Sequence, residues 1–255
     1  MPLITVNHFS ITLLRNMPCT VILPRSAELS SKKLPVLWLL HGKGDDHTTW
    51  SRRTSIERYA DEHGLAVVMP NGENSNYSNM AHGHPYFDYI AKELPDLLGG
   101  MFNLSPRRED NFIAGNSMGG GGALKIGLAF PEGYAAIGCL SAGDTVFPFP
   151  NTKPGDKPEI DCLVHRFYDG KEIEGTEEDV LGSARKIAEN GLPAPRIFHA
   201  IGKDDFLLDA AHHTRDFFTS LEGNPFDYTY IEDEGDHCWA YWDKHIVDFL
   251  DYIMK

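Results

Sequence analysis

The chain has 255 residues, of which 42% are hydrophobic and 24% are charged, and these values are typical of a soluble globular protein. A single domain of this length buries about 70–75% of its unfolded-chain surface, so its folding requires neither disulfides nor metals. Its 23 basic and 37 acidic residues give a formal net charge of −14, which disfavours binding to nucleic acids and to anionic membranes.

The sequence shows no signal for export or for membrane insertion. Its first residues contain neither a basic region nor a long apolar region, so we predict no signal peptide. The longest apolar stretch, near residues 34–40, is far shorter than the ~20 residues that span a bilayer. The cysteines have no CxxC or zinc-like spacing and are expected to be reduced thiols, which favours a cytoplasmic protein. They are Cys19, Cys139, Cys162 and Cys238.

Strand-like and helix-like segments alternate along the chain. Residues 4–14 and 17–23, joined by Arg15 and Asn16, predict an antiparallel hairpin. Several short apolar runs follow, as expected of strands buried on both faces of a parallel sheet. The predicted strands after the hairpin are 36–40, 65–69, 111–114, 134–140, 197–201 and 226–231.

Helical patterns lie between these strands. Apolar residues recur three or four apart over 56–63, 180–188 and 239–253. Segment 86–98 has the same spacing, but Pro95 interrupts it, so we expect a kink or two short helices. The alternation predicts an α/β fold with a mostly parallel central sheet and helices on both faces.

One stretch does not fit this alternation. Residues 145–169 are rich in proline and glycine and follow a predicted strand end, where the ligand sites of open α/β sheets gather. We interpret 145–180 as a loop or small cap over such a site, with a plain surface loop as the alternative. No repeat or linker divides the chain, so residues 1–255 are predicted to form a single domain.

The strongest chemical signal is the G-x-S-x-G sequence Gly115-Asn116-Ser117-Met118-Gly119, which lies between a predicted strand and the helical run 123–128. In this motif the serine occupies a strained strand-to-helix turn, where larger side chains at the glycine positions would clash with backbone. The glycines at 120–122 each weaken the helix start by about 1 kcal/mol relative to alanine, so we expect close packing there. This context predicts that Ser117 is a nucleophile.

A serine hydroxyl needs a base, and in such sites an acid and then a histidine follow the serine along the chain. His237 fits because it lies between the last predicted strand and the last predicted helix, where a loop can hold an imidazole over the sheet edge. His199 lies inside a predicted strand, where a core histidine is more common. The remaining downstream histidines lie in the irregular stretch or on helices that more often expose them: His165, His212, His213 and His245.

The acid should follow the strand 197–201, where it would hold the imidazole in the correct tautomer. Asp204 and Asp205 both qualify, and Asp209 is a weaker third. Acyl transfer also needs donors for an oxyanion. One should be the backbone N–H of Met118, and the other should come from the loop 41–46, whose small residues let amides face a substrate.

These residues resemble the esterase D-type group of α/β-hydrolases, and within it the bacterial tributyrin esterases. The resemblance implies an α/β-hydrolase fold and a serine carboxylesterase that cleaves short-chain acyl esters without a cofactor. The Asp-Phe-Leu of that family falls on Asp205-Phe206-Leu207, which selects Asp205 over Asp204. The second oxyanion amide is then that of Lys43. The matching segments run along most of the chain: 39–42, 67–71, 93–95, 114–120 and 235–239.

Some positions distinguish branches of this family. S-formylglutathione hydrolases tend to carry paired tyrosines after the catalytic histidine, whereas this chain has Trp239-Ala240-Tyr241-Trp242, which favours the tributyrin esterase branch. Gly121 and Lys43 depart from the family, where Tyr or His and an apolar residue are frequent. An oxyanion amide needs no particular side chain, so these departures affect the pocket and not the mechanism. The remaining predicted site residues are the motif glycines Gly42, Gly115 and Gly119 and the pocket residues His41, Trp239 and Phe147.

Other chemistries have weaker support. There is no H-E-x-x-H, and His82-Gly83-His84 is only a weak ligand pair, so no metal is expected. No P-loop or dinucleotide fingerprint occurs, and Cys238 neighbours His237 in sequence instead of facing it. The expected partner is a small-molecule ester, and homo-oligomerisation stays open. Alternative functions are an acetyl or feruloyl sugar-ester deacylase, an S-formylglutathione hydrolase-like thioesterase, or an inactive binding protein.

Overall fold

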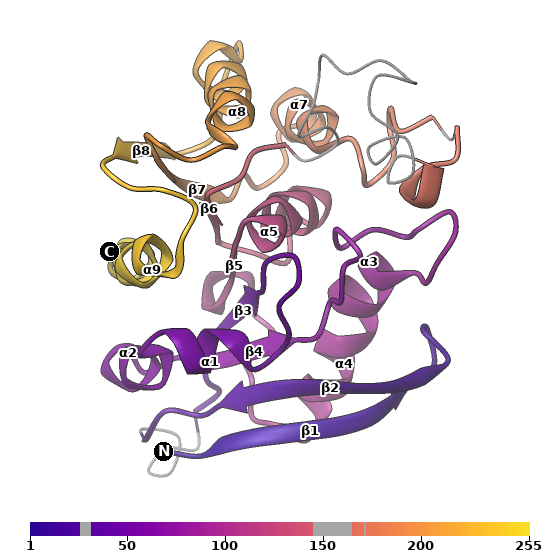
Figure 1. The fold of residues 1–255 in the computed structure, drawn as a ribbon, viewed down its shortest axis with the longest axis vertical. Coiled ribbons are helices and arrows are strands. Elements are labelled where there is room, and N and C mark those ends of the chain that lie inside the picture. Colours follow the sequence, from indigo (N-terminus) through magenta and orange to yellow (C-terminus); the bar gives the residue numbers. More distant parts are fainter. Residues whose placement is uncertain (26–31, 145–164, 171) are drawn as a thin grey trace.

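The computed structural model describes residues 1–25, 32–144, 165–170 and 172–255, which contain one eight-stranded sheet with helices on both faces (Figure 1). The strand order is β1-β2-β4-β3-β5-β6-β7-β8. β1 (Leu3–Ser10) and β2 (Arg15–Ile22) form an antiparallel hairpin, β2 pairs antiparallel with β4, and all other neighbours are parallel. The predicted mostly parallel sheet is therefore confirmed.

The inner strands are buried on both faces. Alternate residues of β3 (Val36–Leu40) enter opposite cores, with Trp38 on one side of the sheet and Leu37 and Leu39 on the other. This explains why the inner strands read as continuous apolar runs. The other strands are β4 (Ala66–Pro70), β5 (Asn111–Asn116), β6 (Ala136–Leu140), β7 (Arg196–Gly202) and β8 (Tyr228–Asp233).

The helices form a layer on each face of the sheet (Figure 1). One layer consists of α1 (Thr49–Arg53), α2 (Ile56–His63) and α9 (Trp239–Ile253). The other consists of α3 (Tyr86–Asp88), α4 (Leu94–Met101), α5 (Met118–Ala129), α7 (Val180–Asn190) and α8 (Leu208–Ser220). The apolar stripes predicted over 56–63, 180–188 and 239–253 are the buried faces of α2, α7 and α9.

The interruption predicted at Pro95 is confirmed. A single π-helical turn, η2 (Tyr89–Glu93), joins α3 to α4, and Pro95 falls in the first turn of α4. The backbone stays helical from Tyr86 to Met101, and the wider π turn before Pro95 accommodates a residue that has no N–H to donate.

The predicted N-terminal hairpin forms, but the predicted position of its turn is wrong. The turn covers residues 11–14, so Arg15 and Asn16 belong to β2. The cause lies far along the chain, at Glu93. Its carboxylate accepts hydrogen bonds from Ser10 Oγ and from the amides of Ile11 and Thr12, at 2.8, 2.8 and 2.9 Å.

Within the described ranges, no helix has the length and apolarity to cross a bilayer. Residues 145–164 and 171 lie outside the described part of the chain, and with them most of the predicted cap 145–180 and the predicted pocket residue Phe147. The cap and the single domain therefore stay predictions.

Candidate active site

Ser117 lies at the bend between β5 and α5. Its φ of +53° and ψ of −121° fall in a region that residues with a side chain rarely adopt, so the backbone there is strained. The Ser117 N–H donates to the Leu140 carbonyl at 2.8 Å, which ties the bend to β6. The bend presents the hydroxyl at the carboxyl ends of the strands, where loops from neighbouring strands can reach it.

The motif glycines let this bend pack directly on the end of β3. A Cβ on Gly119 would lie 2.4 Å from the Leu40 carbonyl oxygen, and a Cβ on Gly115 would lie 2.5 Å from the Gly119 carbonyl oxygen. Both positions are surrounded by backbone, which cannot give way as a side-chain end can. No larger residue fits at either position unless the bend itself moves.

His237 comes from the loop between β8 and α9 and reaches the Ser117 hydroxyl. The distance from His237 Nε2 to Ser117 Oγ is 2.8 Å, and Nδ1 lies 2.9 and 3.0 Å from the two carboxylate oxygens of Asp205. The ring packs against Phe206 and Trp242, with centroid distances of 4.4 and 5.0 Å. Its orientation is therefore fixed by two hydrogen-bond partners and two aromatic neighbours.

Of the three acidic candidates, the structure places Asp205 on this ring and leaves Asp204 and Asp209 exposed. The Asp205 side chain is 0% exposed, and its Oδ1 also accepts the Leu207 amide at 2.9 Å. An ionised carboxylate can only accept hydrogen bonds, so the proton sits on His237 Nδ1. Nε2 then presents a lone pair to the Ser117 hydroxyl, which is the tautomer that a general base requires.

Two of the histidines that follow Ser117 in sequence, His199 and His245, are buried away from it. His199 lies in β7, contacts the Tyr228 hydroxyl at 2.8 Å and the Ala142 carbonyl at 2.7 Å, and has a pKa lowered to about 4 by burial. The prediction of a core histidine is thus confirmed. For His245 the expectation of an exposed side chain is wrong, because it is 1% exposed on the face of α9 that packs against the sheet.

The loop after β3 approaches the nucleophile bend at Gly42, where a Cβ would lie 2.9 Å from Asn116 Nδ2. The Gly42 carbonyl accepts hydrogen bonds from His41 Nδ1 at 2.8 Å and from the Asp45 amide at 3.2 Å. Because C=O and N–H point in opposite directions in a trans peptide, these bonds turn the Lys43 N–H away from them. Across the described ranges, neither this amide nor that of Met118 has an acceptor in the protein. Both are free to bind an external oxygen.

The predicted pocket residues lie in different surroundings. His41 is 1% exposed and so does not form a pocket wall. Its Nδ1 donates to Gly42, and its Nε2 accepts the Gly72 amide at 2.9 Å, so the ring is neutral, and burial lowers its pKa. His41 therefore shapes the loop that carries Lys43. Trp239 is half-buried and makes edge contacts with Trp50 and Trp242, at centroid distances of 5.0 and 5.1 Å.

Sequence reasoning missed Tyr77, which braces this loop. Its fully buried ring lies against two glycines, since a Cβ on Gly72 or Gly122 would come within 2.5 or 2.4 Å of it. Its hydroxyl donates to the His41 carbonyl at 2.9 Å. The close packing expected of the glycine run is thus confirmed at Gly122. The sequence signal that could have identified Tyr77 is its position as the one aromatic residue in the polar stretch 71–79.

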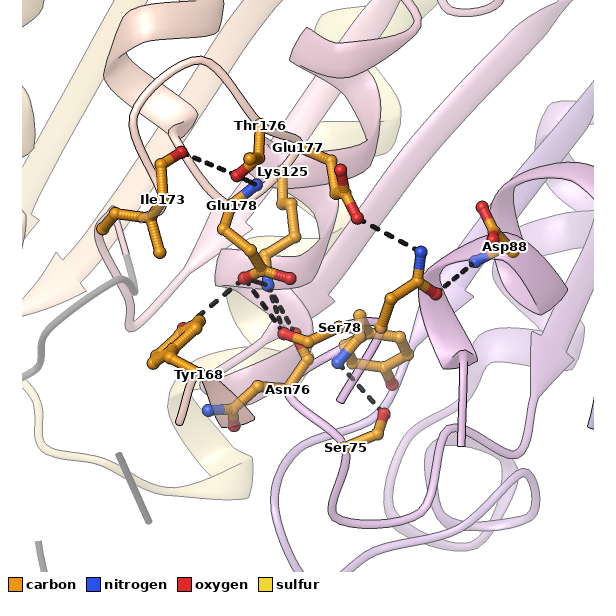
Figure 2. Close-up of polar contacts among 12 residues, drawn as sticks. Ser75, Asn76, Ser78, Asp88, Lys125, Tyr168, Ile173, Thr176, Glu177 and Glu178 are labelled. Carbon is orange, nitrogen blue, oxygen red and sulfur yellow. Dashed lines mark hydrogen bonds and ion pairs between the residues drawn. The ribbon is translucent and has the colours of Figure 1, made fainter. Parts of the chain in front are cut away.

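Sequence reasoning also missed the buried ion pair between Lys125 and Glu178 (Figure 2). Lys125, on α5, is 1% exposed, and its Nζ lies 2.6 Å from Glu178 Oε2, 2.6 Å from Ser78 Oγ and 3.0 Å from the Asn76 carbonyl. Burial lowers the pKa of Lys125, and the Glu178 carboxylate opposes that shift. The pair joins the nucleophile helix to the loop 75–78 and to the segment before α7.

Comparisons with known proteins identify the family of the chain. A family model described as a putative esterase matches residues 10–253. An acetyl esterase of Caldicellulosiruptor saccharolyticus is 29% identical, over 100% of this chain and 99% of that protein.

Two solved Staphylococcus aureus structures are similar over their whole length. The substrate-bound fluorophosphonate-binding serine hydrolase FphF has a TM-score of 0.85 at 34% identity, covering 100% of this chain and 98% of its own. The S-formylglutathione hydrolase FrmB has a TM-score of 0.83 at 35% identity, covering 100% and 99%. The α/β-hydrolase fold implied by the sequence resemblance is therefore confirmed.

Gly119→Ala should lower the free energy of unfolding by about 1–3 kcal/mol or more, because the new Cβ would overlap the Leu40 carbonyl. Esterase activity should fall with it, since the bend that carries Ser117 must shift. Gly99→Ala is the matched control: nothing lies within 4 Å of its Cβ position, so this exposed helical site should gain about 1 kcal/mol. Urea denaturation measures both. A Gly119→Ala protein with wild-type stability and activity would contradict this packing.

Lys125→Met should destabilise the fold by about 3–5 kcal/mol, because it leaves Glu178 buried without its cation. The double variant Lys125→Met/Glu178→Leu should recover most of that loss, since it removes both charges. Urea denaturation of the two single variants and the double variant gives the coupling energy. If the losses of the single variants simply add in the double, the two side chains do not interact.

Proposed function

The chain belongs to the putative esterase family, and from that premise we propose that it hydrolyses short-chain carboxylic esters through an acyl-enzyme on Ser117. Family membership and the serine hydrolases and esterases among its relatives make it a serine esterase. The observation that carries the proposal is the hydrogen-bonded series Ser117, His237, Asp205, with all contacts at 3.0 Å or less.

In the proposed acylation step, Ser117 Oγ attacks the ester carbonyl carbon while His237 Nε2 takes the hydroxyl proton. The Asp205 carboxylate stabilises the imidazolium that forms. The developing oxyanion accepts hydrogen bonds from the amides of Met118 and Lys43, and each such donor typically contributes about 10²–10³ in rate. The imidazolium then protonates the departing alcohol, and the acyl group remains on Ser117.

Deacylation repeats the same proton transfers with water in place of serine. His237 Nε2 takes a proton from the water as it attacks the acyl carbonyl, and the same two amides bind the second oxyanion. The imidazolium returns its proton to Ser117 Oγ, and the carboxylic acid leaves. His237 accounts for every proton moved, so the proposal includes no cofactor.

The proposed substrate is a small ester, as in the tributyrin esterase branch. Phe206, which is 75% exposed, packs against His237, and the half-buried Trp239 packs on Trp242, the other aromatic neighbour of that ring. Phe206 and Trp239 thus offer an apolar surface to a short acyl or alcohol group. The acetyl esterase relative supports the same substrate class. The second candidate is a thioesterase acting on S-formylglutathione, which the 35% identity to FrmB supports.

A substrate panel separates these candidates. The kcat/KM should be highest on p-nitrophenyl acetate and butyrate, lower on octanoate, and lower on S-formylglutathione and acetylated xylo-oligosaccharides. Ser117→Ala should lose both turnover and labelling by a fluorophosphonate probe, whereas Cys238→Ala should retain both. An active Ser117→Ala protein would refute the nucleophile, and a preference for the thioester would replace the proposed substrate.

Asp205→Asn and Asp204→Asn form a matched pair that tests the acid. Asp205→Asn should lower kcat by about 10⁴-fold, because an amide at this position favours the wrong imidazole tautomer. Asp204→Asn should have little effect, since its side chain is exposed and lies off the ring. Steady-state kinetics on p-nitrophenyl acetate give both values, and equal losses would refute the assignment.

A further inference from the structure

Two histidines and an aspartate lie together on the surface. None of them belongs to the hydrogen-bonded series Ser117, His237, Asp205. His82 precedes α3, whereas His165 and Asp169 lie in the described segment 165–170. His82 Nε2 is 2.7 Å from Asp169 Oδ2, and His165 Nδ1 is 2.8 Å from Asp169 Oδ1. The two imidazoles stack with their centroids 4.6 Å apart. The sequence suggested only a weak ligand pair of His82 and His84, whereas in the structure His82 contacts His165 and Asp169.

We propose that His82, His165 and Asp169 bind one divalent transition-metal ion, with Zn²⁺ as the reference ion. Their three ligand atoms all lie within 4.8 Å of one another. Zinc binds imidazole nitrogen and carboxylate oxygen at about 2.0–2.2 Å, so two tetrahedral ligands of one ion lie about 3.3 Å apart. The side chains are 52%, 65% and 44% exposed, so they can rotate to this spacing without movement of the backbone.

The backbones that carry these ligands are already fixed to each other. The amide of Ala81 donates to the Phe167 carbonyl and the amide of His82 donates to the Arg166 carbonyl, both at 3.0 Å. Phe167 is 5% exposed and belongs to the hydrophobic core, so the segment is anchored from inside. His165 and Asp169 are four residues apart on one turn and therefore share a face. The backbone therefore loses little conformational entropy when the ion binds.

The charge and chemistry of the cluster select the ion. Within the described ranges, Asp169 forms ion pairs with the two imidazoles, which carry no charge when they ligate a metal. The cluster then has one negative charge on a chain whose net charge is −14, and a cation is attracted to it. Imidazole nitrogens favour Zn²⁺, Co²⁺, Ni²⁺ or Cu²⁺ over Mg²⁺ and Ca²⁺, which prefer oxygen ligands.

A bound ion would cross-link the loop before α3 to the segment before α7. Glu178, which also precedes α7, is bound to Lys125 of α5. The chain before α7 would then be attached at the surface by the ion and in the interior by this ion pair. The proposed ester hydrolysis uses neither contact directly, and the inference therefore does not depend on the role of Ser117.

The test is a titration of the EDTA-treated full chain with Zn²⁺ by calorimetry and with Co²⁺ by visible absorption. Wild type and Ser117→Ala should bind one equivalent with the same affinity, and Zn²⁺ should raise their Tm. His82→Ala and Asp169→Asn should weaken binding about tenfold or more, because loss of even an outer-shell partner typically costs about 10–100-fold. His84→Ala, which removes a neighbouring exposed imidazole outside the cluster, is the control and should bind as wild type does.

Three outcomes would overturn the proposal. The first is an absence of binding by the wild-type chain. The second is binding that His82→Ala and Asp169→Asn leave unchanged, which would place the ion on other histidines. The third is a loss of binding in Ser117→Ala, because the ion would then sit at the proposed active site.

Discussion

The candidate active site depends on one steric constraint, the packing that holds the backbone of Ser117 in a strained conformation. A conformation with φ of +53° persists only where neighbouring groups leave the chain no alternative. Here the neighbours are the end of β3, packed on Gly119, and β6, bonded to the serine amide. The strain is thus offset by contacts that belong to the sheet itself. For this reason the hydroxyl is held rigidly enough to meet an imidazole from a separate loop.

The loop formed by residues 71–78 connects this packing to the Lys43 amide, the second proposed oxyanion donor. The Tyr77 ring packs between Gly122 of the nucleophile helix α5 and Gly72 of its own loop, and its hydroxyl donates a hydrogen bond to the His41 carbonyl. His41 in turn fixes the Gly42 carbonyl and thereby the direction of the Lys43 amide. Lys125 and Glu178 lock the loop from the side of α5. One continuous set of packed side chains therefore determines the positions of both proposed oxyanion donors, the amides of Met118 and Lys43.

The sequence predicted those features that local pattern controls. Continuous apolar runs identified the inner strands, and Pro95 marked the break between α3 and α4, because both depend on neighbouring residues. The hairpin turn was misplaced because Glu93, distant in sequence, determines it. Asp204 and Asp205 share one turn, so spacing could not separate them, and the family resemblance pointed to the residue that the fold places on His237. Lys125 gave no local signal, since only the fold shows that it is buried with Glu178.

The long separation between serine and imidazole has a consequence for the order in which the protein is made. His237 follows Ser117 by 120 residues, and Asp205 lies between them. At translation rates of ~5–20 residues per second, the ribosome delivers the imidazole about 6–24 s after the hydroxyl. Until His237 has been made and β7 and β8 have joined the sheet, the growing polypeptide carries a serine without its base. Any hydrolysis that needs His237 as base can therefore begin only when the sheet is complete.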